Sequence, residues 1–107
     1  MKYDVEYFYN MLRMYSKTAE HICKVRWDFV SEANPKTVLD YGSGCGFFKA
    51  FAPEGILVDT YDIMPVPITG ITLDRYDLVT FWDVLEHIPD FNAIVPVLSM
   101  AQYVAIT

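Results

Sequence analysis

Three glycines and an acidic residue form the most informative cluster of residue types in the sequence. Residues 38–48 read VLDYGSGCGFF, in which Gly42, Gly44 and Gly46 follow Asp40 at intervals of two residues. Glycine has no Cβ, so a turn of this composition can adopt positive φ and let the backbone approach a ligand closely. A helix that begins just after the turn would direct unpaired N–H groups at that ligand. The segment therefore predicts a turn that binds a small ligand.

A second cluster combines two carboxylates with an imidazole. Asp83, Glu86 and His87 stand at positions i, i+3 and i+4, so one helical turn would bring them to the same face. Such a set can bind a divalent ion, and its oxygen ligands favour Mg²⁺ or Mn²⁺. The alternative is that the two carboxylates bond loop N–H groups while His87 packs against a neighbouring helix. We assign no metal site from the sequence.

These clusters require strands and helices that place them. An uninterrupted apolar run over 37–41 predicts a buried parallel strand that ends at the glycine turn. A short helix over 47–52, stopped by Pro53, and a second strand over 56–61 complete a βαβ unit. The order of these elements predicts an α/β fold built on a parallel sheet.

A further carboxylate, Asp62, follows the second strand sixteen residues after Gly46. At that place its two oxygens can accept hydrogen bonds from the two hydroxyls of a ribose. The alternative is a helix cap or a turn former before Met64. Asp59 is the rival ribose ligand, but it falls within the strand, where it would need a polar partner of its own.

The glycine spacing separates two kinds of nucleotide site. A dinucleotide-binding turn reads G-x-G-x-x-G, and its third glycine would fall on Phe47. The D-x-G-x-G-x-G found here instead resembles motif I of the class I S-adenosylmethionine (SAM) dependent methyltransferases. Residues 75–90, RYDLVTFWDVLEHIPD, are similar to the FDLV…DVLEHI segment of type 11 and type 23 members, including the ubiquinone-biosynthesis O-methyltransferases. A nicotinamide dehydrogenase is the disfavoured alternative.

This resemblance covers about residues 37–107 and implies a Rossmann-like, doubly wound, mostly parallel sheet with strand order 3-2-1-4-5-7-6. It implies that eight residues bind the cofactor: Asp40, Gly42, Gly44, Gly46, Asp62, Phe81, Trp82 and Asp83. Asp40 would orient the turn, Asp62 would hold the ribose, and residues 81–83 would lie beside the methionine moiety. The D/E-x-x-E-H pattern also resembles metal ligands of some ubiquinone-pathway and small-RNA methyltransferases.

The implied activity is in-line transfer of a methyl group from SAM to a small-molecule acceptor. The protein must hold donor and acceptor close, aligned and dry. An oxygen acceptor also needs a base, and the ordinary pKa of an imidazole makes His87 the candidate. Its alternative role is to order the turn before Pro89. The competing function class is a non-catalytic SAM-binding or partner-binding module, or a truncated piece that lacks the acceptor site.

We expect one domain over 1–107, with a helical lid or cover at 1–34 and an incomplete core at 35–107. Residues 3–31 are predicted helical, with an apolar stripe that Arg26 interrupts; the stripe is Phe8, Leu12, Tyr15, Ala19, Ile22 and Phe29. Asp90 is expected to cap a helix that Pro96 kinks or delays.

Two prolines and a glycine leave no room for a normal helix between Asp62 and Arg75, so a third strand over 68–73 is expected to be vestigial. A fifth strand over 103–107 is expected to be the last, so the fold would be truncated there. Its edge would then be covered by a homodimer partner, by strand exchange or by the amino-terminal helices.

Composition narrows the function classes. The net charge is −6, from 8 basic and 14 acidic residues, which argues against nucleic acid as a partner. The most apolar stretch, 55–73, carries two aspartates and two prolines and so predicts no membrane span. The two cysteines, Cys23 and Cys45, form no disulfide framework or metal pattern, which is typical of free thiols in the cytoplasm.

Overall fold

The computed structural model describes residues 5–44, 46–62 and 70–107, and over residues 5–17 it describes the backbone alone. Its helices and strands, in chain order, are α1 (Val5–Val30), β1 (Thr37–Tyr41), α2 (Phe47–Ala50), β2 (Leu57–Tyr61), β3 (Tyr76–Phe81), α3 (Val95–Leu98) and β4 (Ala101–Ile106). Short 3₁₀ helices connect some of them: η1 (Ser31–Ala33), η2 (Leu85–His87) and η3 (Phe91–Ile94).

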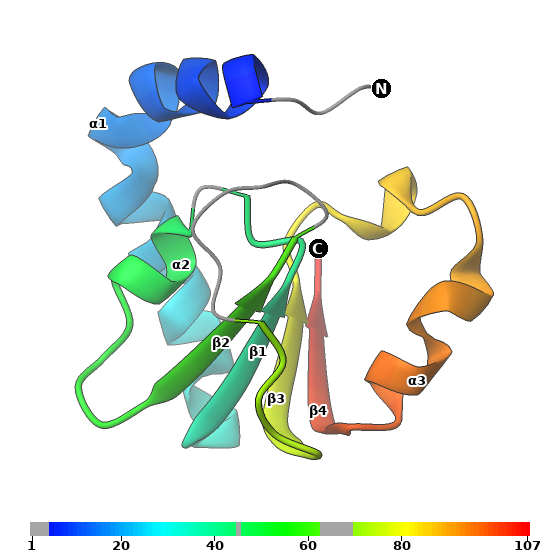
Figure 1. The fold of residues 1–107 in the computed structure, drawn as a ribbon. Helices are drawn as coiled ribbons and strands as arrows, with labels where there is room; N and C mark the ends of the chain where they lie inside the picture. The colour runs from blue at the N-terminus through cyan, green and yellow to red at the C-terminus, as the bar shows by residue number, and fades with distance from the viewer. Residues whose placement is uncertain (1–4, 45, 63–69) are drawn as a thin grey trace.

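The four strands form one sheet in the order β2-β1-β3-β4, and every neighbouring pair is parallel (Figure 1). This is the 2-1-4-5 part of the strand order that the sequence resemblance implies, so the doubly wound α/β class is confirmed. The chain leaves β1 toward β2 on one side, and it leaves β3 toward β4 on the other. The carboxyl ends of β1 and β3 therefore flank the switch point where such sheets bind ligands.

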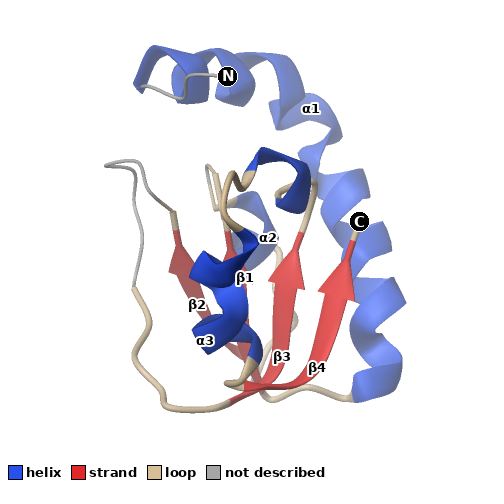
Figure 2. Cartoon of the chain, turned by 90° about the vertical axis from the view of Figure 1, so that its right-hand side faces the viewer, coloured by secondary structure: helices blue, strands red, loops and turns tan. Residues whose placement is uncertain are grey.

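Helices cover both faces of this sheet (Figure 2). Alternate residues of a strand point to opposite faces. Accordingly, Val38 and Leu78 belong to one core cluster with residues of α1, and Leu39 and Val79 belong to a second cluster beside α3. The first part of α1 crosses above the carboxyl ends of the strands, and after a bend the helix descends beside the sheet (Figures 1 and 2).

The buried face of α1 differs from the predicted stripe. Its buried residues are Ala19, Cys23, Trp27 and Val30. Ile22 and Phe29 are 38% and 65% exposed, so the stripe is wrong beyond Ala19. The side chains of the earlier stripe residues lie outside the described part of the chain. Trp27 explains the rotation, because its ring stacks on Phe48 at 4.0 Å and its indole N–H donates to the Phe48 carbonyl at 2.9 Å.

The predicted third strand does not form over the part of it that the structure describes, residues 70–73. A single backbone bond, from Gly70 N–H to the Thr60 carbonyl at 2.9 Å, joins this segment to the edge of β2. On the other side of the sheet, Asp90 accepts from Asn92 N–H at 3.0 Å and caps η3, and α3 begins next to Pro96, as expected. Among the helices of the described ranges, none has the length and apolar character needed to cross a membrane.

Candidate functional site

The glycine turn follows β1 at the carboxyl edge of the sheet. Gly42, Gly44 and Gly46 all have positive φ, at 77°, 58° and 78°, a region that residues with a Cβ rarely adopt. The N–H groups of Gly42 and Ser43 both donate to the Tyr61 carbonyl, at 2.7 and 3.1 Å. The turn is therefore fixed to the end of β2, and its alternating glycines are a conformational requirement.

Close packing adds a second requirement at Gly42. A Cβ placed on this residue would lie 2.6 Å from Cγ2 of Val84, closer than real side chains approach. A Cβ on Gly46 would have no described atom within 4 Å. Gly42 therefore allows the segment after β3 to close on the turn, whereas Gly46 supplies only the left-handed backbone before α2.

Asp62 holds the turn directly. Its Oδ2 accepts the Gly44 N–H at 2.8 Å, so the carboxylate at the end of β2 fixes the middle of the turn. Asp40, to which the resemblance gave this orienting role, instead accepts from Thr80 Oγ1 at 2.8 Å inside the sheet. Asp40 is 2% exposed, and this burial raises its pKa to about 6, although the Thr80 bond and the Arg26 charge act in the opposite direction.

Asp59, the rival ribose ligand, has its own partners. Its Oδ2 accepts from the Tyr76 hydroxyl at 2.6 Å and from the N–H and hydroxyl of Thr72. Burial opposes ionisation, but these hydrogen bonds leave the pKa of Asp59 below its usual value. Asp59 therefore anchors the segment beyond Gly70 to β2, and of the two aspartates only Asp62 contacts the glycine turn.

Phe81, Trp82 and Asp83 follow one another at the carboxyl end of β3, and each has a different environment. Phe81 is fully buried in the cluster beside α3, while Trp82 is 7% exposed in the cluster beside α1. Asp83 is exposed and has a positive φ of 56°. The structure thus places one exposed carboxylate between two buried aromatic residues and the loop that contains η2.

Two buried polar groups near the turn have no hydrogen-bond partner among the described residues. They are the Ser43 hydroxyl, within the turn, and the Trp82 indole N–H, at the end of the neighbouring strand. An unsatisfied buried polar group costs about 1–3 kcal/mol. Such groups are rare in folded proteins, and these two lie at the carboxyl edge, where open parallel sheets bind their ligands.

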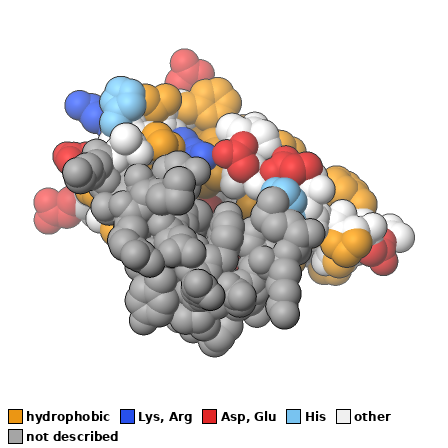
Figure 3. All heavy atoms as spheres, turned by 90° about the horizontal axis from the view of Figure 1, so that it is seen from above, with side chains coloured by type: hydrophobic (Ala, Val, Ile, Leu, Met, Phe, Trp, Pro, Cys, Tyr) orange, Lys and Arg blue, Asp and Glu red, His pale blue; other side chains and the backbone are white. Residues whose placement is uncertain are grey.

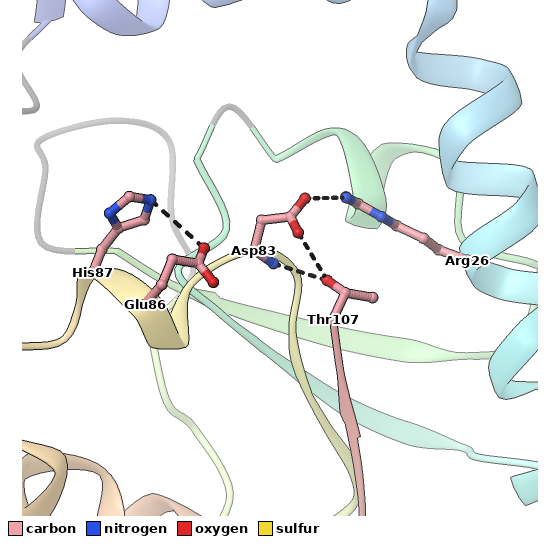
Figure 4. Close-up of polar contacts among 5 residues, drawn as sticks. All are labelled: Arg26, Asp83, Glu86, His87 and Thr107. Carbon is pink, nitrogen blue, oxygen red and sulfur yellow. Dashed lines mark hydrogen bonds and ion pairs between the residues drawn. The ribbon is translucent and has the colours of Figure 1, made fainter.

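Asp83, Glu86 and His87 do not converge (Figure 4). Asp83 is directed at Arg26 and Thr107, while Glu86 Oε1 lies 3.6 Å from His87 Nε2. Within the described ranges no three His, Cys, Asp or Glu side chains are grouped as metal ligands. Viewed from above the sheet edge, acidic side chains and a histidine lie together at the surface (Figure 3). These three side chains therefore do not have the geometry that a shared metal ion needs.

Sequence reasoning missed two residues that the structure brings to Asp83. Arg26 Nη2 lies 3.2 Å from Asp83 Oδ2, and Asp83 N–H donates to Thr107 Oγ1 at 2.9 Å. The signal for Arg26 was present, because it is the one charged residue that interrupts the predicted apolar stripe of α1. Thr107 carried no comparable signal.

Comparison with known proteins places this site in a family. Residues 14–99 match the model of the methyltransferase domain family, and this range includes the glycine turn, the end of β2 and the whole of β3. No curated protein and no solved structure matches the chain. The matched segment holds both motifs on which the resemblance rested, in the strand order that it implied. The chain therefore belongs to the methyltransferase domain family, with the class I fold of the SAM-dependent enzymes.

Proposed function

We propose that this chain binds SAM at the carboxyl edge between β1 and β3 and transfers its methyl group to a small-molecule acceptor. Membership of the methyltransferase domain family supports methyl transfer in general. The observation that carries the cofactor proposal is the glycine turn, which Tyr61 and Asp62 fix in place and which brings together two buried polar groups, Ser43 Oγ and Trp82 Nε1, that have no partner among the described residues.

The unpartnered groups fit the methionine end of this cofactor. The Trp82 indole N–H is a donor only and needs an acceptor, whereas the Ser43 hydroxyl can donate or accept. A methionine carboxylate offers acceptors to both. Because a carboxylate accepts through two oxygens, Asp62 can hold Gly44 and also receive a ribose hydroxyl.

The negative charge near the site favours SAM over a nicotinamide dinucleotide as the cofactor. Asp62 and Glu86 both follow strands at the carboxyl edge of the sheet, and the chain carries a net charge of −6. Such a surface attracts the sulfonium of SAM and repels the pyrophosphate of a nicotinamide dinucleotide. In addition, α2 spans only four residues and offers a weak dipole for a phosphate.

When bound, SAM would supply its methyl group for an in-line displacement, in which the acceptor would attack the methyl carbon and the sulfur would leave with the electrons of the broken C–S bond. The residues of this chain would position the two molecules and exclude water. For an oxygen acceptor, His87 would take the departing proton, and Glu86 at 3.6 Å would stabilise the imidazolium that results.

Isothermal titration with SAM, with its demethylated product S-adenosylhomocysteine (SAH) and with NAD tests the proposal. We expect micromolar binding of SAM and SAH and no binding of NAD. Gly44→Val should abolish binding, because the side chain strains the turn and fills space at the ligand. Gly55→Val is the matched control, since Gly55 also has positive φ, at 87°, but lies between α2 and β2. NAD binding, or SAM binding that Gly44→Val leaves intact, would refute the proposal.

A further inference from the structure

Arg26 connects α1 to the end of β3. Its guanidinium lies 3.2 Å from Asp83 Oδ2 and 5.1 Å from the centre of the Trp82 ring. The ion pair is partly exposed, with 27% of the Arg26 side chain and 71% of the Asp83 side chain accessible. One side chain thus contacts two consecutive residues of the candidate site from a helix 57 positions earlier in the sequence.

The residue that Arg26 contacts has an unusual backbone. Asp83 has a φ of 56°, in the left-handed region, which few residues other than glycine adopt and which aspartate tolerates better than most because its side chain can hydrogen-bond locally. Thr107 also holds it, because its hydroxyl accepts from the Asp83 N–H at 2.9 Å and donates to Asp83 Oδ1 at 3.2 Å (Figure 4). Arg26 and Thr107 together therefore hold the left-handed turn immediately after β3 and Trp82.

That turn determines where Val84 lies. Val84 follows Asp83 directly, and its side chain sits so close to Gly42 that a Cβ there would be 2.6 Å from Cγ2. A change in the backbone at Asp83 would move Val84 against the glycine turn or away from it. A continuous line of contacts therefore runs from Arg26 through Asp83 and Val84 to Gly42.

We propose that Arg26 is a positioning residue of the cofactor site, which acts through Asp83 to seat Val84 on the glycine turn. The proposal rests on the proposed function for the identity of the ligand, but the line of contacts does not depend on it. Arg26 would thereby make cofactor binding sensitive to how α1 packs, since the first part of that helix crosses above the same sheet edge (Figure 1). Removing Arg26 should weaken the site without removing any group that contacts the cofactor.

A double-mutant cycle on Arg26 and Asp83, read by titration of SAH, tests this role. We expect Arg26→Gln to weaken SAH binding by about tenfold, the combined worth of an exposed ion pair and a cation–π contact, and Asp83→Asn, which removes the ion pair alone, to weaken it by about threefold. The double variant should be no weaker than Arg26→Gln. Arg26→Lys should recover part of the loss, because it keeps the charge but not the planar stacking.

Lys24→Gln is the matched control, since it removes a cation from an exposed position of the same helix. It should bind SAH as the wild type does. Wild-type affinity in Arg26→Gln, or losses that multiply in the double variant, would overturn the proposal.

Amide spectra without ligand separate this inference from the proposed function. The ¹H–¹⁵N signals of Gly42 and Val84 should shift in Arg26→Gln and stay in place in Lys24→Gln. A wild-type protein that binds no SAH would refute the proposed function, and the amide signals would then decide the contact line alone. Unchanged Gly42 and Val84 signals in Arg26→Gln would overturn the inference in either case.

Discussion

Gly42→Ala is expected to destabilise the fold by two separable effects. The alanine must adopt the φ of 77° that Gly42 has, which costs a residue with a Cβ about 1–2 kcal/mol. Its Cβ would also lie 2.6 Å and 2.9 Å from the two methyl groups of Val84, and overpacking of this kind costs about 1–3 kcal/mol more. The sum, about 2–5 kcal/mol, is a large part of the roughly 5–15 kcal/mol that stabilises a typical domain. Urea denaturation followed by circular dichroism measures the loss.

Gly46→Ala isolates the backbone effect. Its φ of 78° is close to the 77° of Gly42, but no described atom lies within 4 Å of the position that its Cβ would take. We therefore expect Gly46→Ala to cost only the backbone part, about 1–2 kcal/mol. The difference between the two variants reports the contact with Val84. Equal losses of stability in the two variants would refute the packing argument.

Two further predictions concern Asp40 and the exposed apolar side chains of β4. Burial raises the pKa of Asp40 from 3.8 to about 6, so the stability that its protonated carboxyl provides is present below pH 4 and is lost as the pH rises through 6. Asp40→Asn should therefore remove on the order of 3 kcal/mol from the pH dependence of the free energy of unfolding, measured by urea titration at several pH values. The same pH dependence in the variant and the wild type would contradict this prediction. Strand β4 carries no charged residue, and it exposes three large apolar side chains: Tyr103 at 52%, Val104 at 41% and Ile106 at 50%. We therefore expect the protein to self-associate in sedimentation velocity experiments and Val104→Lys to abolish the association. A monomeric wild type would count against this prediction.

The parts of the fold that local patterns determine were predictable from the sequence. An apolar run followed by alternating glycines locates β1 and its turn, and the structure ends β1 at Tyr41 with three positive φ values in the turn that follows. Asp90 was predictable as a cap because capping involves only neighbouring backbone N–H groups, and it caps η3. Such features depend on a few adjacent residues, so a single sequence contains enough information for them.

The orientation of α1 was not predictable in this way. Two apolar stripes compete on this helix, and they share Ala19 before one continues through Ile22 and the other through Cys23 and Trp27. Only tertiary contacts decide between them. The Trp27 ring stacks on Phe48 and its N–H reaches a carbonyl of α2, which directs Arg26 toward the carboxyl end of β3. Periodicity marks Arg26 as a break in an apolar stripe, but only this packing shows that it contacts Asp83.

Residues 70–73, the described part of the segment beyond β2, are joined to that strand mainly by side chains. A parallel strand beside β2 would satisfy a ladder of edge groups, but among the described residues 70–73 the backbone-to-backbone bond to β2 is the one from Gly70 N–H to the Thr60 carbonyl. The Asp59 carboxylate compensates by accepting from Thr72 and Tyr76, and Tyr76 is itself the first residue of β3. This network joins the edge strand to the start of β3, and it gives a buried aspartate the partner that its place within a strand demands.

The positions of Asp40 and Asp62 relative to their strands explain why Asp40 bonds Thr80 inside the sheet and Asp62 bonds the glycine turn. Asp40 lies within β1, where its neighbour across the sheet is Thr80, so its carboxylate is satisfied inside the core and cannot follow the chain into the turn. Asp62 lies one residue beyond β2, next to the Tyr61 carbonyl that already receives two N–H groups of the turn. A carboxylate there can hold Gly44 and remain at the edge where a ligand binds. The aspartate that contacts the turn is thus the one just past a strand end, because its side chain is not held between neighbouring strands as the side chain of Asp40 is.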